Sequence, residues 1–534
     1  MLLLALACTA SPPATQSPAE AGPASGDSLV LAVPFDPGNL NPLVAPYALS
    51  GWYIDSVQPG LVLREVTPEG LRYRPALAER WDWSADGQVL TYTLKPGLVW
   101  SDGVPLTAAD VAFTWTLIGD EKVASNWFDE SRAIAQVEAV DERHVAFHFV
   151  HAGNPDLLQS FTIRGVVPEH VLKDADRASL RGHPSSHAPL SSGPWVVSAW
   201  QDNEKLVLEP NPRNTAFPQP HLQRIITRVI PEYSTRLIEL QNGGIDYLPS
   251  LEVSDIPIMK RDYPQFKLLQ IQSESMNYIG WNLRDARLAE ARVRRALTLA
   301  IDRDKLLADV LTVDGVRYGR PCVGTVPPNF GEWFNADIQP LPADKEQARA
   351  LLAEAGWTDS DHDGLLDRGG EPFTIDLLVQ SGIPQNQQIA VYAQAALAEV
   401  GVKLEIQSVE PNRFSALARG HEFEAILWSF GSRAPVDPTI QWHSTGQYNW
   451  MGYSDPETDK LLEELRTTTD IDRAKAISRE VQARVYEAQP ATFLWWEDGV
   501  AALNDRFEDV HFSLYNAIEQ SELWWVPADK QRWN

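Results

Sequence analysis

The chain has 534 residues, and 44% of them are hydrophobic, which predicts a globular protein of about two to four packing units. With 72 acidic and 45 basic residues the formal charge is -27, which repels the phosphates of nucleic acids and of anionic lipids. Neither nucleic acid nor an anionic membrane surface is therefore expected as a partner.

The N-terminus carries a candidate lipid anchor. A short apolar run at residues 2–7 precedes Cys8, and a segment rich in Pro, Ala and Ser continues to about Asp27. The run is too short to cross a bilayer, but it resembles the end of a bacterial lipoprotein signal. We predict a lipid on Cys8 and a flexible tether over residues 1–27, with a chance apolar N-terminus on a cytoplasmic protein as the alternative.

The second cysteine, Cys322, has no nearby partner in the sequence, and no C-x-x-C motif is present. A zinc knuckle and a dithiol redox site are therefore not expected. We predict that Cys322 is a small buried residue.

The first half of the chain alternates strand and helix signals. Apolar runs at 29–33 and 89–94 predict strands. Thr107 and Asp110 form a capping box, and apolar residues at helical spacing follow them to residue 118. Residues 193–209 predict a β-hairpin.

The second half continues this mixture. Apolar residues at helical spacing predict a helix at 293–301. A helix from Asp344 to about residue 355 has a capping residue and a terminating Gly356. Further helices are predicted at 387–400, 456–467 and 472–488, and a half-buried strand at 402–406. Mixed helices and strands throughout favour an α/β fold.

At this point the sequence resembles a known family. Residues 73–115 are similar to the signature region of the family-5 extracellular solute-binding proteins, the oligopeptide-, dipeptide- and nickel-binding group. Further similar segments follow in the family's order: NLNPL at 39–43, SSGPWVV at 191–197, LEPNP at 208–212, GGIDYL at 243–248, RVRRALTLAIDRDKLL at 292–307, ARALLAEAGW at 348–357 and GYSDPETDKLL at 452–462.

The resemblance implies a two-lobed periplasmic-binding-protein fold (type II-like) with an additional subdomain in the first lobe. The implied boundaries are 28–72, 190–277 and 495–534 for lobe I, 73–189 for the extra subdomain, and 278–494 for lobe II. The function that the resemblance implies is non-enzymatic: we expect the chain to be the substrate-binding component of an ABC importer.

In that role a monomer, lipid-anchored in the periplasm or at the outer cell surface, captures a peptide or peptide-like solute by closing its lobes. It then delivers the solute to the membrane permease subunits. The alternatives are a sensor or adaptor that uses the same cleft, and a binder of oligosaccharide or another non-peptide solute.

The resemblance also points to candidate ligand contacts. In relatives that bind peptides, an acidic residue follows the strand that contains Trp428, whereas Ser432 and Arg433 stand there in this chain. This difference puts an unmodified peptide ligand in doubt. Arg433 can bind a carboxylate or phosphate, or it can be a solvent-exposed residue that pairs with a surface acid. The predicted ligand-binding residues are Trp428, Ser429, Arg433, Tyr278, Trp281, Asn282, Tyr448, Trp450, Trp442 and Tyr47. Core packing is the alternative for Trp428, and a role in the hinge is the alternative for Tyr278, Trp281 and Asn282.

An Asp-rich loop offers a possible calcium site. Asp359, Asp361, Asp363 and Asp367 occupy positions 1, 3, 5 and 9 of an EF-hand-type loop, but position 12 is Gly370 and supplies no ligand. A solvated acidic loop is the favoured interpretation, and a weak structural calcium site is the alternative.

Enzyme motifs are absent from the sequence. It contains no H-E-x-x-H, G-x-S-x-G or S-x-x-K motif, and no phosphate-binding Gly-rich loop ending in Gly-Lys. These absences count against zinc proteases, elbow-type serine hydrolases, penicillin-recognising enzymes and P-loop NTPases, and they leave a carboxylate-pair hydrolase open. Together with the resemblance, they favour a binding protein that requires no cofactor.

Overall fold

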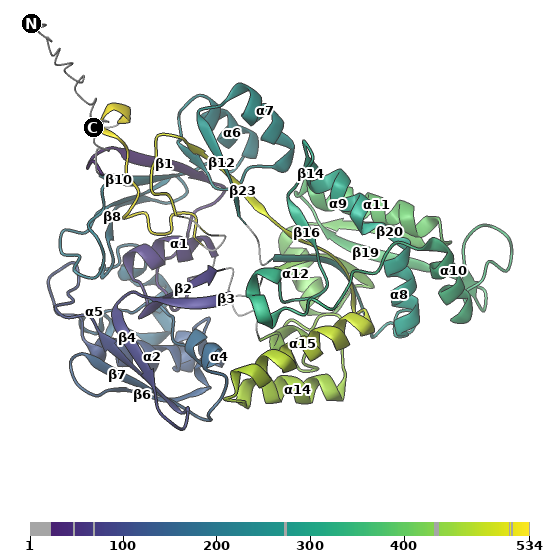
Figure 1. Ribbon diagram of the computed structural model, residues 1–534, viewed down its shortest axis with the longest axis horizontal. Coiled ribbons are helices and arrows are strands. Elements are labelled where there is room, and N and C mark those ends of the chain that lie inside the picture. Colours follow the sequence, from purple (N-terminus) through teal and green to yellow (C-terminus); the bar gives the residue numbers. More distant parts are fainter. Residues whose placement is uncertain are drawn as a thin grey trace, which may run out of the picture.

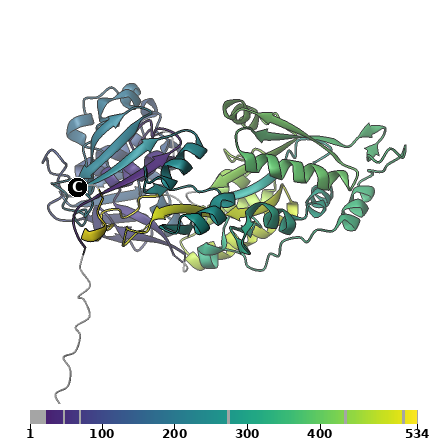
Figure 2. The same ribbon diagram turned by 90° about the horizontal axis from the view of Figure 1, so that it is seen from above.

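A computed structural model describes residues 23–45, 48–67, 70–271, 275–431, 437–511, 513 and 516–532. Two lobes lie side by side, each built around one large β-sheet (Figure 1). Figure 2 shows the same two lobes from above. The mixed α/β architecture predicted from the sequence is confirmed.

Lobe I contains a seven-stranded sheet with the order β12-β23-β11-β1-β10-β9-β8. Its strands are β1 (Ser28–Val33), β8 (Trp195–Gln201), β9 (Lys205–Pro210), β10 (Arg224–Val229), β11 (Tyr247–Leu248), β12 (Phe266–Ile271) and β23 (Gly499–Asn504). Strand β1 pairs in parallel with both β10 and β11, and all six of its residues are buried. Its helices are α1 (Ala48–Val57), α6 (Tyr233–Gln241) and α7 (Ile256–Asp262).

A smaller subdomain extends lobe I. Its antiparallel sheet has the order β4-β5-β7-β6, and a separate hairpin is formed by β2 and β3. The bounds are β2 (Val62–Thr67), β3 (Gly70–Pro75), β4 (Ala78–Trp83), β5 (Val89–Leu94), β6 (Ile134–Ala139), β7 (His144–Phe149), α2 (Ala108–Ile118), α3 (Phe128–Ser131), α4 (Pro155–Ser160) and α5 (Glu169–Leu172). The capping box predicted from Thr107 and Asp110 is present at the start of α2.

Lobe II contains a six-stranded sheet with the order β16-β22-β13-β21-β19-β20. The strands are β13 (Ser275–Trp281), β16 (Gly319–Pro321), β19 (Thr374–Gln380), β20 (Lys403–Val409), β21 (Ala425–Gly431) and β22 (Ala491–Glu497). Two-stranded ladders are formed by β14 (Thr312–Val313) with β15 (Val316–Arg317), and by β17 (Asp367–Arg368) with β18 (Glu371–Pro372).

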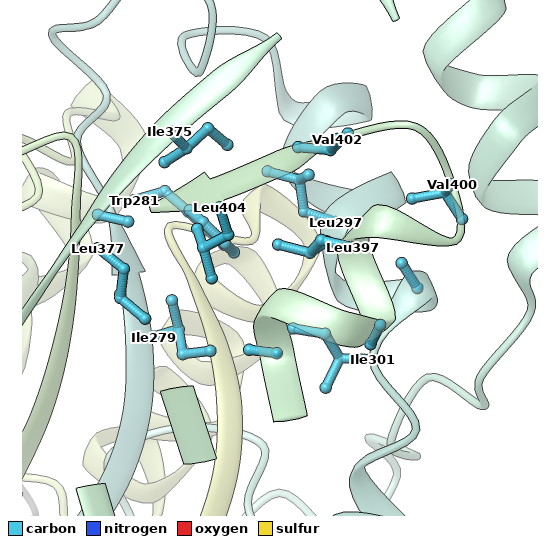
Figure 3. Packing of buried hydrophobic residues seen from close by; sticks show 14 of the residues in the cluster. Ile279, Trp281, Leu297, Ile301, Ile375, Leu377, Leu397, Val400, Val402 and Leu404 are labelled. Carbon is cyan, nitrogen blue, oxygen red and sulfur yellow. The ribbon is translucent and has the colours of Figure 1, made fainter. Parts of the chain in front are cut away.

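Helices cover both faces of the lobe II sheet. One hydrophobic core joins the sheet to α8 (Ala291–Ala300), α9 (Arg303–Leu311), α10 (Lys345–Glu354) and α11 (Pro384–Ala398), and Figure 3 shows part of it. The other core joins the sheet to α12 (Pro411–Arg419), α13 (Thr439–Trp442), α14 (Pro456–Thr467) and α15 (Ile471–Ala488). The central strands are therefore buried on both faces, as expected for strands with continuous apolar runs.

Several local predictions are confirmed. The hairpin expected at 193–209 is β8 with β9. Helix α10 begins where Asp344 accepts a hydrogen bond from the backbone N–H of Gln347 at 2.8 Å, and Gly356 follows it with a φ of 83°. Helix α11 begins three residues before the predicted start, at Pro384, since proline fits the first turn of a helix. Cys322 is fully buried, and burial raises the pKa of its thiol.

The chain changes sheets at two places. It leaves the lobe I sheet at the end of β12, at Ile271, and enters the lobe II sheet at Ser275. It returns between β22 and β23, where only Asp498 separates the two strands. The exact residue boundaries expected for the lobes and the subdomain stay predictions.

A buried ion cluster joins the start of the folded chain to the segment that follows β23. The Arg506 guanidinium pairs with Asp27 and lies 3.0 Å from the carboxylate of Asp246, and all three side chains are at most 3% exposed. Arg506 also donates to the backbone carbonyl of Ser28 at 3.1 Å. Burial raises the pKa of Asp246, and the positive charge of Arg506 opposes that rise.

Replacing Arg506 by methionine removes the cation between two buried carboxylates. We expect the Arg506→Met variant to lose about 3–5 kcal/mol of unfolding free energy, because an uncompensated buried charge is costly. Urea denaturation measures this loss. The matched control is Arg261→Met, at an exposed pair with Asp262, for which a change within about 0.5 kcal/mol is expected. Equal stability of the two variants would contradict a structural role for the cluster.

Candidate functional site

The strand directions place the carboxyl ends of strands in both large sheets next to the connections between the lobes. In lobe II, β19, β21 and β22 run in the same direction, because β21 and β22 are both antiparallel to β13. Their carboxyl ends therefore share the edge at which the chain enters from lobe I. In lobe I, β1, β10, β11 and β12 likewise end at the edge from which the chain leaves. Ligands of open α/β sheets bind outside the carboxyl ends of the strands.

Aromatic side chains gather at this edge of lobe II. Trp428, near the end of β21, is half-buried and stacks on Phe414 of α12, with 5.1 Å between ring centroids and 17° between ring planes. The ring of Trp450 lies 5.1 Å from that of Trp428. Tyr448 contacts both Trp450, at 5.8 Å, and Phe430, at 5.4 Å.

These five residues, Phe414, Trp428, Phe430, Tyr448 and Trp450, form what we call the aromatic cluster. It extends from the buried ring of Phe414 to Tyr448, which is 36% exposed. Three of the predicted ligand residues, Trp428, Tyr448 and Trp450, are thus brought together by the fold. Aromatic rings in such a position provide apolar contact area with a fixed geometry.

Polar groups lie on the opposite face of the same strand ends. The hydroxyl groups of Ser429 and Ser275 are 2.8 Å apart. Asn277, which is paired with Ser429 in the sheet, donates to the Glu497 carboxylate at 3.3 Å. The edge therefore offers hydroxyl, amide and carboxylate groups within one small region.

Glu497 was not among the residues expected at the site, nor was Asn277. Burial raises the pKa of Glu497, and the negative charge of Glu252 in lobe I adds to the rise. The two lobes thus bring these carboxylates within electrostatic reach of each other. The sequence signal is a single acidic residue directly after the buried run at 491–496, at the carboxyl end of a strand.

Four predicted ligand residues lie in packed surroundings instead. Tyr278, Trp281 and Trp442 are at most 1% exposed and belong to the two cores of lobe II. The Trp281 indole N–H donates to Thr492 at 3.2 Å, and that of Trp442 donates to Thr325. Asn282 donates to the backbone carbonyl of Phe423 at 2.7 Å. This burial gives the four side chains a packing role, and their predicted ligand contacts stay predictions.

Three further predictions concern Tyr47, Arg433 and Cys8. These residues lie outside the part of the chain that the structure describes. The roles predicted for them stay predictions.

Asp498, the one residue between β22 and β23, is held from both lobes. Its carboxylate accepts a hydrogen bond at 2.9 Å from the side chain of Gln270, on β12 of lobe I. It also lies 3.4 Å from the guanidinium of Arg320, on β16 of lobe II. Its backbone N–H donates to the carbonyl of Tyr318 at 3.0 Å. The connection between the lobes is therefore anchored on each side.

The Asp-rich loop is drawn together as the spacing predicts. Ligand atoms of Asp359, Asp361 and Asp363 lie within 4.8 Å of one another. The Asp359 carboxylate accepts the backbone N–H groups of Asp363 and Gly364, both at 3.1 Å. Asp367 instead accepts two hydrogen bonds from Ser360. Hydrogen bonds within the loop thus account for this arrangement, and calcium binding stays an untested alternative.

For the loop we expect the behaviour of a solvated turn. Addition of about 10 mM calcium, above the dissociation constants of weak extracellular calcium modules, should leave the Tm unchanged. A differential scanning measurement with and without a chelator checks this. A rise in Tm that is abolished by Asp361→Asn would instead establish a calcium site.

Among the described residues, no helix is both long and apolar enough to cross a membrane.

Comparison with known proteins identifies the family of this chain. Residues 72–452 match the profile of the bacterial extracellular solute-binding proteins, family 5 (middle region). The oligopeptide-binding protein AppA of Bacillus subtilis is 25% identical over 473 residues, which cover 86% of this chain and 85% of that protein.

Protein XP55 of Streptomyces lividans is 28% identical over 528 residues, covering 96% of this chain and 90% of that protein. The solved structure of Bacillus subtilis AppA with a nonapeptide superposes with a TM-score of 0.80 at 24% identity. That superposition covers 95% of this chain and all of the other, and it supports the two-lobed fold. The chain belongs to the family-5 bacterial extracellular solute-binding proteins.

Proposed function

We propose that this protein is the substrate-binding component of an ABC importer and captures a peptide or peptide-like solute between the facing sheet edges of its two lobes. The observation that carries the proposal is the aromatic cluster at the carboxyl edge of the lobe II sheet, the edge that faces lobe I. The match to the family-5 extracellular solute-binding proteins supports the proposal.

Several relatives have names that state a peptide ligand. They include the oligopeptide-binding protein of Bacillus subtilis and the dipeptide-binding protein of Escherichia coli. Others are named for nickel and for heme. The names favour a peptide or similar solute as the ligand of this chain. They do not say which peptide sequence it binds.

The strand ends suggest how such a solute is held. The aromatic cluster provides apolar contact for a side chain of the ligand. On the other face, Ser275, Ser429 and Asn277 supply hydrogen-bonding groups for peptide amides. The half-buried carboxylate of Glu497 can accept from an N–H group or an ammonium group, and such charge-assisted bonds are stronger when water is excluded.

Binding is coupled to movement because the ligand touches both lobes. A solute that contacts lobe I and lobe II interacts more strongly with the closed arrangement, and so shifts the population toward it. The permease subunits then recognise the closed, loaded protein. Binding, closure and delivery of the solute involve no covalent step.

A second ligand class follows from the same aromatic cluster. Exposed aromatic faces also bind sugar rings by stacking, so an oligosaccharide is the alternative solute. A sensor or adaptor would use the same site but a different partner. Lipid anchoring through Cys8, a monomeric state and a location in the periplasm or at the outer cell surface complete the proposal.

A thermal-shift screen tests the proposal with peptide mixtures, oligosaccharides and metal chelates as probes. A solute at about one hundred times its Kd should stabilise the folded protein by about 2.7 kcal/mol and raise the Tm. We expect a rise with the peptide mixtures. The Trp428→Ala variant should bind roughly tenfold or more weakly, because it loses a central aromatic contact.

The matched control is Trp83→Ala. Trp83 is also half-buried and stacks on a phenylalanine, Phe149, but it lies on β4 of the subdomain. Both variants lose similar packing, so the comparison is between ligand-induced shifts and not between absolute Tm values. Equal shifts in the two variants would rule out the aromatic cluster as the binding site, and a shift with oligosaccharides alone would change the solute class.

A further inference from the structure

The subdomain of lobe I makes a close backbone contact with lobe II at Gly153. Gly153 lies between β7 and α4 and is buried. A Cβ atom added to Gly153 would lie 2.3 Å from the backbone carbonyl oxygen of Arg466, in the last turn of α14. In Figure 1, α4 lies beside the end of α14. Only a residue without a side chain fits between these two backbones.

The requirement at Gly153 concerns space and not backbone conformation. Gly153 is not among the residues with positive φ, so another residue can adopt its backbone angles. The Arg466 carbonyl belongs to the final turn of a helix, where carbonyl groups have no amide partner four residues further along. A Cα–H group directed at such an oxygen makes a weak hydrogen bond.

Neighbouring residues extend the same contact. A Cβ atom on Gly87, in the turn between β4 and β5, would lie 3.3 Å from the methyl group of Thr469. Lys475 on α15 is close enough to Asp156 on α4 to oppose the rise in the pKa of Asp156 that burial causes. The subdomain therefore meets the turn between α14 and α15 over several residues.

Arg466, whose carbonyl receives Gly153, also forms a partly buried ion pair. The Arg466 guanidinium forms an ion pair with Asp437, with nitrogen–oxygen distances of 2.8 and 3.0 Å. Asp437 is 5% exposed and follows β21, the strand of Trp428, by six residues. The helix end that receives Gly153 therefore also holds Asp437, the first described residue after β21.

We propose that Gly153 is the residue that permits lobe closure, because its lack of a side chain lets the subdomain seat against the carboxyl end of α14. A side chain at this position holds the lobes apart and shifts the population toward the open state. The biological meaning of this movement rests on the proposed function, but the contact itself can be tested without any solute.

A disulfide between the lobes reports how often the contact forms. The chain is prepared with Cys8→Ser, Gly87→Cys and Thr469→Cys, and Cys322 is buried and does not compete. Gly87 has a φ of 69°, at which a cysteine is strained, so urea denaturation first checks that this parent background is folded. In a disulfide, a Cβ atom lies about 3 Å from the partner's sulfur, close to the 3.3 Å separation at this contact. We expect the 87–469 disulfide to form under mild oxidation, and peptide mapping by mass spectrometry measures its rate.

Adding Gly153→Ala to this background should slow disulfide formation roughly tenfold, since the rate follows the fraction of closed molecules. The control is Gly182→Ala, because Gly182 has no atom within 4 Å of its added Cβ and should leave the rate unchanged. Urea denaturation checks that each variant is folded. If Gly153→Ala does not fold, Ala152→Trp adds bulk beside the same contact and should slow the reaction likewise.

Two results would overturn the proposal. One is a disulfide that forms as fast with Gly153→Ala as without it, and the other is no disulfide in a parent background that urea denaturation shows to be folded. Neither depends on a ligand. A thermal-shift screen without any response would therefore count against the proposed function and leave this inference standing.

Discussion

The two large sheets are joined through Asp498 and through the passage from β12 to β13, and the site depends on this short double connection. Both passages start from carboxyl ends of strands, so the carboxyl edges of the two sheets face each other. Asp498 is held by Gln270 of lobe I and Arg320 of lobe II, which fixes where the lobes meet.

The buried charges and the candidate site have different roles in this two-lobed arrangement. Arg506 holds Asp27 and Asp246 in the interior of lobe I, far along the chain from one another. The strand ends of lobe II instead carry a half-buried carboxylate and partly exposed rings. Rigid lobes with polar and aromatic groups at their facing edges are what binding by closure requires, because the ligand must distinguish two arrangements of the same lobes.

Local structure was predictable where short-range chemistry decides it. The capping box of α2, the hairpin of β8 and β9, and the cap and end of α10 are all present as expected. The site was predictable only in part. Strands β13 and β22 are covered on both faces, so an apolar pattern cannot tell a core tryptophan such as Trp281 from a ligand contact. Glu497 and Gly153 were not predicted because their contacts are with residues far along the chain, such as Asn277 and Arg466, and no local sequence pattern reveals such contacts.

The most direct test of the central claim, that a peptide or similar solute binds in the crevice between the lobes, is native mass spectrometry of the full chain after incubation with a peptide mixture. The account predicts one bound peptide per chain, present with the wild-type protein and with Trp83→Ala and strongly reduced with Trp428→Ala. No bound peptide in any form, or equal binding by all three, would contradict it.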